Sequence, residues 1–250
     1  MQKTENITPE IILQKYSKHL RKKKEELEYL VCMNRQFEKW LQCELVLTMS
    51  KMAFPVAYDS DYSEIRYQYE DGTWEQICDI STEFPAQDLP HTLRPDICIA
   101  EKPFVSKYID KKTWMIRDEE AYRKCEYEYG QARYHYIELK QLKWVGIDDP
   151  DIVSTVMTGD LKKYSDQDWR TLKSSYNPSS FISFCFVPFW NPAKPHRRCS
   201  ILAMRKAIKK IRTKATAEGD QYFGMRGIFT SKCIMRELCL LMLFYKLWKY

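Results

Sequence analysis

Apolar positions recur at two different periods along the chain, and these periods divide it into predicted helices and strands. Residues 9–52 carry apolar side chains at helical spacing, with no Gly or Pro after Pro9, which predicts helix. Residues 134–144 give the clearest strand pattern. The remaining segments with a clear preference are helical at 151–175 and 199–217, a short buried strand at 94–100 and an aromatic strand at 181–189.

Three further segments complete the predicted order. Residues 64–80 favour a β-hairpin, because alternating apolar positions flank the turn signal Asp71-Gly72. Residues 103–130 are charged, aromatic and partly helical, and are interpreted as an insertion. Residues 229–248 are apolar without a period that separates helix from strand. The order of elements predicts an α/β fold with a mixed central sheet flanked by helices.

Composition limits the class of protein. With 250 residues, 44% of them hydrophobic, the chain can form one sizeable domain with attachments, or two small ones. Nine cysteines without C-x-x-C spacing indicate reduced thiols in a cytoplasmic protein rather than a zinc site. No apolar stretch of about 18 residues and no apolar N-terminal region is present, so neither a membrane span nor a signal peptide is expected.

Acidic and basic side chains interrupt two of the predicted strands. Side chains alternate between the faces of a strand, so Glu138 and Lys140 point the same way. Asp96 begins the apolar strand Asp96 to Ala100. If the two strands pair, Asp96 and Glu138 converge, and two close carboxylates repel each other unless a cation lies between them. Such an oxygen-rich pair suits Mg²⁺ or Mn²⁺.

Glu44 is a third candidate. On a helix it falls within about 60° of Phe37, Trp40 and Leu41, which form an apolar face. A carboxylate on such a face is costly unless it is paired or coordinated. Glu44 is therefore expected to point inward, toward a polar group.

These features together resemble the PD-(D/E)XK nuclease superfamily. The matching residues are Glu44, then Pro95-Asp96, then Glu138-Leu139-Lys140. The resemblance implies a restriction-endonuclease-like core. The expected organisation is an N-terminal helical segment at 1–34, the nuclease-like core at 35–190, and a basic C-terminal helical extension packed on that core at 191–250.

The resemblance also implies a mechanism, namely metal-assisted hydrolysis of phosphodiester bonds. Asp96 and Glu138 would hold the metal ion, Mg²⁺ or Mn²⁺, with the backbone carbonyl of Leu139. Lys140 would orient or activate a water and offset charge on the phosphoryl group, and Glu44 would position a second metal ion or its waters. Taken singly, each residue is more often a salt bridge or a capping group, so the argument depends on their combination.

Positive charge is concentrated in one window of the chain. No Asp or Glu occurs between Asp168 and Glu218, and eleven Lys and Arg residues lie there. An ordinary solvated helix face is one interpretation, and a surface that binds nucleic-acid phosphates is the other. The residues expected to bind nucleic acid are Arg197, Arg198, Arg205, Lys206, Lys209, Lys210 and Arg212.

The hypothesis that follows is a cytoplasmic, Mg²⁺-dependent endonuclease acting on DNA. By resemblance alone, its setting is bacterial or phage DNA processing or defence. One alternative is a catalytically silent module with the same fold that binds nucleic acid or a protein partner. Another is a toxin-like or interaction protein without affinity for nucleic acid. Whether the chain forms a homodimer is left open.

Overall fold

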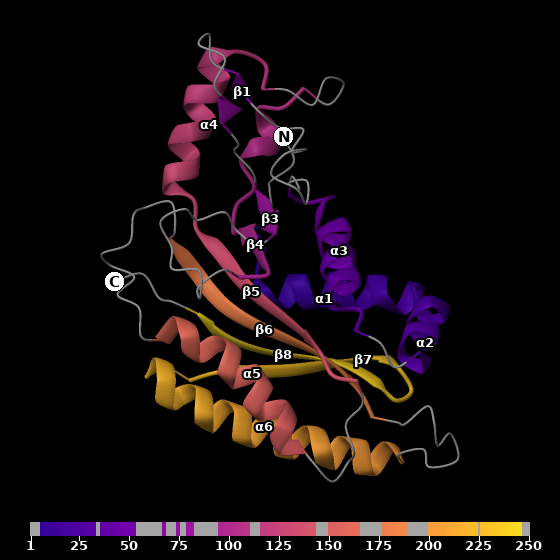
Figure 1. Cartoon of the computed structure of the whole chain (residues 1–250). Coiled ribbons are helices and arrows are strands. Elements are labelled where there is room, and N and C mark those ends of the chain that lie inside the picture. Colours follow the sequence, from indigo (N-terminus) through magenta and orange to yellow (C-terminus); the bar gives the residue numbers. More distant parts are fainter. Residues whose placement is uncertain are drawn as a thin grey trace.

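The protein forms a mixed six-stranded sheet with helices on both faces (Figure 1). The computed structural model describes residues 6–33, 36–53, 67–68, 74–75, 79–82, 95–110, 116–143, 150–165, 177–189, 200–224 and 226–246. Its helices are α1 (Pro9–Lys22), α2 (Lys24–Cys32), α3 (Glu38–Met49), the short 3₁₀ turn η2 (Val105–Lys107), α4 (Glu119–Gln131), α5 (Pro150–Ser165) and α6 (Ile201–Phe223). Its strands are β1 (Tyr67–Gln68), β2 (Trp74–Glu75), β3 (Ile80–Thr82), β4 (Ile97–Ala100), β5 (Tyr134–Gln141), β6 (Pro178–Pro188), β7 (Ile228–Met235) and β8 (Leu238–Lys246).

The large sheet has the strand order β3-β4-β5-β6-β8-β7. Strands β3, β4 and β5 are antiparallel neighbours, whereas β5 and β6 are parallel and are connected through α5. Consecutive parallel strands need a crossover connection that returns the chain to the opposite end of the sheet, and α5 provides it here. Strands β7 and β8 form an antiparallel hairpin, and β8 lies inside the sheet between β6 and β7.

The sheet separates two apolar cores. Ile137 and Leu139 of β5 lie in the core shared with α1, α2 and α3. Tyr134 and Tyr136 lie in the opposite core, shared with α4, α5 and α6. Figure 1 shows α5 and α6 together along one face of the sheet and α1 to α3 on the other side. Because side chains alternate along β5, Glu138 shares the face of Tyr136 and points toward α5.

Local sequence signals set several helix ends. The Thr8 hydroxyl caps α1 by accepting from Ile11 N at 3.3 Å, and Pro9 takes the first helical turn, where its missing N–H costs nothing. Ser200 caps α6 in the same way, accepting from Ala203 N at 3.1 Å. At the far end of α6, Gly224 adopts φ 59°, a left-handed conformation that favours glycine.

The predicted elements are largely present. The predicted helix at 9–52 is observed as three helices, α1, α2 and α3, the last of which ends at Met49, and residues 34–35 lie outside the described part of the chain. The predicted hairpin appears as the pair β1 and β2, while Ile80 belongs instead to β3 in the large sheet. In the segment interpreted as an insertion, η2 and α4 form. The predicted helix 151–175 is observed as α5 to Ser165, and its remaining residues lie outside the described part of the chain.

The C-terminal region is more than a helical extension. In addition to α6 it supplies β7 and β8, two of the six strands of the large sheet. The undecided apolar segment 229–248 is therefore mostly strand. Within the described ranges, no helix is both long enough and apolar enough to cross a membrane.

Candidate functional site

The pairing of β4 with β5 brings Asp96 to Glu138. Ile97 is paired with Ile137 in an antiparallel register, so continuing the register by one residue puts Asp96 opposite Glu138. The Asp96 carboxylate accepts a hydrogen bond from the backbone N–H of Leu139, with an N–O distance of 2.7 Å. The predicted convergence of these two strands is therefore confirmed, and Asp96 is tied to the backbone next to Glu138.

Glu138 is a buried carboxylate with a lysine and a tyrosine as partners. Only 3% of its surface is exposed. Lys163 forms an ion pair with it, and the Tyr164 hydroxyl donates a hydrogen bond to the same oxygen, Oε1. The pKa of Glu138 is raised to about 7, mainly by burial and also by the nearby Asp96 charge, while Lys163 and Tyr164 act in the opposite direction. Its two partners therefore offset only part of the cost of burying its charge.

Lys140 extends from the same face of β5, two residues beyond Glu138. Its ammonium lies 3.6 Å from a carboxylate oxygen of Glu38, at the start of α3. Burial alone would lower the pKa of Lys140, but the charges of Asp160, Asp96, Glu38 and Glu138 outweigh it and raise the pKa above its ordinary value. Lys140 is thus a firmly protonated cation among four carboxyl groups.

Asp160, on α5, is the fourth carboxyl group of this assembly. Burial raises its pKa to about 6, against the lowering effect of Lys140 and Lys163. Its Oδ2 atom is buried and has no hydrogen-bond partner within the described residues. A buried acceptor without a donor is unfavourable unless a proton or a cation satisfies it. We call Glu38, Asp96, Glu138, Asp160, Lys140 and Lys163 the carboxylate–lysine cluster.

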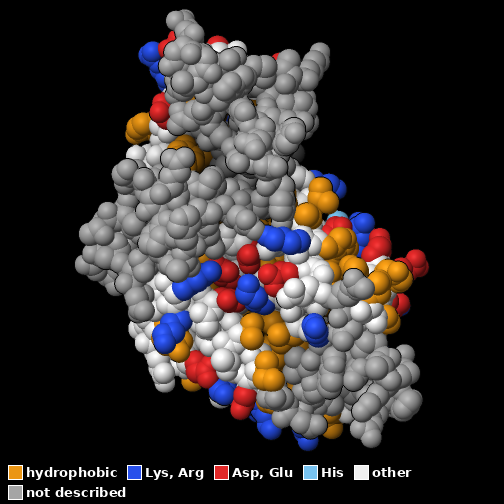
Figure 2. Space-filling model, viewed as in Figure 1, with side chains coloured by type: hydrophobic (Ala, Val, Ile, Leu, Met, Phe, Trp, Pro, Cys, Tyr) orange, Lys and Arg blue, Asp and Glu red, His pale blue; other side chains and the backbone are white. Residues whose placement is uncertain are grey.

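The cluster lies where elements from both sides of the sheet meet. Asp96 precedes β4, Glu138 and Lys140 come from β5, and α3 and α5 supply the remaining members. Figure 2 shows acidic side chains gathered with basic ones near the centre of one face of the molecule. Within the ranges that the structure describes, no group of three or more His, Cys, Asp or Glu side chains is placed to hold a metal ion.

Glu44 is buried and paired, as its position on the apolar face of the helix predicted. Its partners come from α1 and the residue after it: His19 forms an ion pair with one carboxylate oxygen, and Lys23 lies 4.0 Å from the other. The α3 residue in contact with Lys140 is instead Glu38. These contacts put Glu44 at the junction of α1 and α3, and no contact joins it to the carboxylate–lysine cluster within the described part of the chain.

Five of the seven residues predicted to bind nucleic acid belong to α6. Arg205, Lys206, Lys209, Lys210 and Arg212 are all exposed. Arg197 and Arg198, the other two residues predicted to bind nucleic acid, lie outside the described residues.

Sequence reasoning missed Glu38, Asp160, Lys163 and Tyr164. A signal for two of them was available, because Val153, Met157, Asp160 and Tyr164 follow the three- and four-residue spacing of one helix face. A carboxylate on that apolar face raises the same question that singled out Glu44.

Comparison with models of protein families, with curated proteins and with solved structures finds no match for this chain. The interpretation of the site therefore depends on its own geometry and chemistry.

Proposed function

We propose that the chain is a divalent-metal-dependent nuclease that hydrolyses phosphodiester bonds in DNA. The observation that carries the proposal is the meeting of Asp96 with Glu138 across β4 and β5, with Lys140 on the same face. The order α3, β3, β4, β5, α5, β6, with β1 and β2 before β3, with η2 and α4 between β4 and β5, and with β6 parallel to β5, supports a PD-(D/E)XK-type, restriction-endonuclease-like core. DNA processing or defence in bacteria or phages remains a setting suggested by resemblance.

The donor chemistry of the cluster fits a hard cation. Asp96 raises the pKa of Glu138, which means that the two carboxylates lie close enough to repel each other. Asp160 has a buried oxygen without a donor. Mg²⁺ commonly takes only one or two protein carboxylates and completes its shell with waters and substrate phosphates. A site of Asp96, Glu138 and the Leu139 carbonyl is therefore compatible with the absence of a three-ligand group among the described residues.

When bound, the cation would polarise the scissile phosphate and acidify a water. Lys140 keeps its proton, because neighbouring carboxylates raise its pKa. It therefore suits the task of stabilising negative charge on the phosphoryl oxygens better than that of removing a proton from water. Lys163 neutralises Glu138 through their ion pair, so this pair must loosen for Glu138 to bind a cation.

Cleavage of DNA tests the proposal directly. Supercoiled plasmid and labelled linear DNA are incubated with Mg²⁺, with Mn²⁺ and with EDTA. Cleavage is expected only with metal, and Glu138→Ala and Lys140→Ala are each expected to lower the rate by about 100-fold or more. The matched controls are Glu119→Ala and Lys162→Ala, which change exposed carboxylate and lysine side chains. Metal-dependent cleavage that survives Glu138→Ala would refute the assignment.

Metal binding gives a readout that does not depend on turnover. Titration of the protein with Mn²⁺, followed by electron paramagnetic resonance, is expected to show weaker binding in Glu138→Gln. Equal Mn²⁺ affinity in the parent chain and in that variant would remove Glu138 from the proposed metal site.

A second function is favoured by one observation. Glu138 is already engaged by Lys163 and Tyr164, as expected of a site in which an internal cation replaces the metal ion. The chain would then be a catalytically silent module that binds nucleic acid or a protein. Salt-sensitive DNA binding without cleavage in Mg²⁺ or Mn²⁺, in both the parent chain and Lys163→Ala, would support this alternative.

A further inference from the structure

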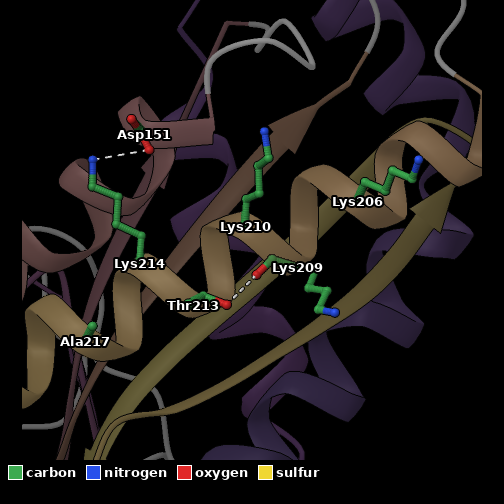
Figure 3. A pocket seen from close by; sticks show the side chains of 7 residues that line it. All are labelled: Asp151, Lys206, Lys209, Lys210, Thr213, Lys214 and Ala217. Atoms are coloured by element: carbon green, nitrogen blue, oxygen red, sulfur yellow. Dashed lines mark hydrogen bonds and ion pairs between the residues drawn. The ribbon is translucent and has the colours of Figure 1, made fainter.

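A hollow of about 600 Å³ lies along α6 beside the start of α5. It is lined by Asp151 of α5 and by Lys206, Lys209, Lys210, Thr213, Lys214 and Ala217 of α6. We call this hollow the lysine groove. Figure 3 shows the side chains of Lys206, Lys210 and Lys214 on the same side of α6, with Lys214 reaching Asp151.

The groove is strongly cationic. Among the described residues its one lining carboxylate is Asp151, which lies 3.2 Å from Lys214; Lys214 is also 3.7 Å from Glu218. Within the part of the chain that the structure describes, Lys206, Lys209 and Lys210 have no ion-pair partner. An anion that binds in the groove is attracted by these ammonium groups and reduces their mutual repulsion.

The spacing of the lysines fits a chain of phosphates better than a single anion. Lys206, Lys210 and Lys214 follow each other at four-residue steps, so the row extends for about 12 Å along the helix. A nucleic-acid strand carries a phosphate about every 3.4 Å of duplex axis. Three or four consecutive phosphates therefore match the length of the row.

The groove also lies close to the carboxylate–lysine cluster. Asp151 and Asp160 belong to the same helix and are separated by about 14 Å along its axis. Strand β5 is antiparallel to α5. Glu138 forms an ion pair with Lys163, whereas Lys140, later in β5, interacts electrostatically with Asp160, which is earlier in α5. The C-terminal end of β5 therefore points toward the end of α5 that lines the groove.

We propose that the lysine groove binds the phosphate backbone of nucleic acid and leads it toward Asp96 and Glu138. This inference rests on the proposed function for its direction, but the binding itself can be tested without catalysis. It differs from the prediction made from sequence, since Arg205 and Arg212 do not line the groove, whereas Asp151, Thr213 and Lys214 do.

Fluorescence anisotropy of a labelled 20-nucleotide single strand and of its duplex, in EDTA and at several salt concentrations, provides the test. The variant Lys206→Ala/Lys210→Ala is expected to bind more weakly. Its slope of log affinity against log salt should be shallower by about 0.9 for each lost duplex contact, or about 0.7 for a single strand. Asp151→Asn is expected to bind more tightly, because it removes the anion that competes with phosphate. Lys18→Ala/Lys22→Ala, an exposed lysine pair at the same four-residue spacing on α1, is the matched control and is expected to leave the affinity unchanged.

Different outcomes separate the two proposals. DNA binding that depends on the groove lysines, without cleavage, would support nucleic-acid binding in the groove and refute the proposed nuclease activity. Cleavage that depends on Glu138, with the same affinity and salt slope in the double-lysine variant, would refute the groove alone. Displacement of DNA by tripolyphosphate at equal charge, or tighter binding to phosphatidylserine vesicles than to DNA, would also overturn the assignment to nucleic acid. Circular dichroism of each variant checks that the fold is retained.

A separate observation concerns two cysteines of the C-terminal hairpin. Cys233 of β7 is paired directly with Cys239 of β8, and their sulfur atoms lie 3.6 Å apart. Cys233 is exposed, while Cys239 is buried. The hydrogen bond with Cys239 lowers the pKa of Cys233, and the Arg21 and Arg205 charges act in the same direction. An exposed thiol with a second thiol beside it is the arrangement of a redox-sensitive pair.

The geometry points to a reversible disulfide between Cys233 and Cys239 that forms with peroxide as oxidant. The Cys233 thiolate attacks one peroxide oxygen, the O–O bond breaks, and water leaves after proton uptake. The Cys239 thiol then displaces the hydroxyl of the sulfenic acid, forming the S–S bond and a second water. Each disulfide thus consumes one peroxide and two thiols.

Peptide mapping tests this pair. Trypsin cuts after Lys232, Arg236 and Lys246, so the two cysteines fall in adjacent peptides, 233–236 and 237–246. After peroxide treatment without reductant, these peptides are expected to be joined, and Cys233→Ser should abolish the joined species. Cys43→Ser, at another exposed cysteine, is the control. Separate peptides after treatment, or a joined species that survives Cys233→Ser, would refute the disulfide.

Discussion

At the scale of single residues, the protein buries the Glu138 carboxylate at a position where its negative charge costs free energy. The pKa of Glu138 is about 7 against an ordinary value of 4.5, so the folded chain holds this proton more tightly than the unfolded chain. Stability from this group is therefore fully present below about pH 4.5 and is lost as the pH rises to about 7. Native proteins accept such costs at functional sites, and substitutions there often raise stability.

Glu138→Gln is accordingly expected to stabilise the protein at pH 8 by about 1–3 kcal/mol, because the amide removes the penalty of a buried charge. At pH 5 the gain should be smaller, since the parent carboxyl is then mostly protonated. Urea unfolding at the two pH values measures the difference. Glu119→Gln, at an exposed carboxylate, serves as the control. An equal change in stability at both pH values would contradict the pKa assignment.

Tyr164 adjusts the same proton equilibrium. Its hydroxyl donates to Glu138 and thereby lowers the pKa of that carboxyl. Tyr164→Phe is expected to raise the pKa of Glu138, so the rise of metal-dependent cleavage with pH should shift to higher pH, with the plateau rate largely kept. Cleavage rates between about pH 6 and 9 give the profile. A shift to lower pH would mean that the tyrosine does not favour the ionised form.

Only some residues of this site could be predicted from the sequence. Asp96, Glu138 and Lys140 were predicted because two-residue alternation fixes which side chains share a strand face. Asp160 and Lys163 were missed because charged residues on a helix usually face water. Only the packing of α5 against β5 decides which part of its surface is buried.

At the scale of elements, α6 approaches the sheet closely at one glycine. A Cβ added at Gly219 would lie 1.4 Å from the hydroxyl oxygen of Tyr245, a buried residue of β8 whose ring stacks on Phe223. The same hydroxyl also lies close to Gly227, where an added Cβ would be 2.5 Å from it, so the tyrosine has little room to move. The absence of a side chain at Gly219 therefore sets how closely α6 can pack on β8.

Gly219→Ala is expected to destabilise the protein by about 1–3 kcal/mol through overpacking. Gly159, inside α5, is the matched control, because an added Cβ there meets no atom within 4 Å. Gly159→Ala should be stabilising by about 0.5–1 kcal/mol, since alanine favours helix over glycine. Thermal unfolding of both variants checks the contrast. A Gly219→Ala protein as stable as its parent would show that α6 can shift away from the sheet.

Element types followed from sequence where polar and apolar residues recur at a fixed period. Strand β5 is buried from Tyr134 to Leu139, but Glu138 and Lys140 alternate with apolar residues, and the predicted helices at 9–52 and 199–217 had clear apolar faces. Strand β8 gave no period, because it is buried on both faces between β6 and β7 from Leu238 to Tyr245. A segment without a polar face carries no periodic signal, so only the sheet order settles its type.

At the scale of the whole molecule, the C-terminal hairpin completes the sheet on which both cores depend. Leu240 belongs to the core on the α1–α3 side and Leu241 to the core on the α5–α6 side, and both are fully or almost fully buried. We therefore expect Leu241→Ala to lower the free energy of unfolding by about 2–5 kcal/mol. Ile228→Ala, on the neighbouring strand but 48% exposed, should cost less than about 1 kcal/mol. Urea denaturation of the two variants measures the difference.

A shortened chain that ends at Gly224 is expected not to unfold cooperatively, because β6 would lose its partner β8. A cooperative transition in that shortened chain would mean that residues 35–190 fold as an autonomous core to which the hairpin merely adds.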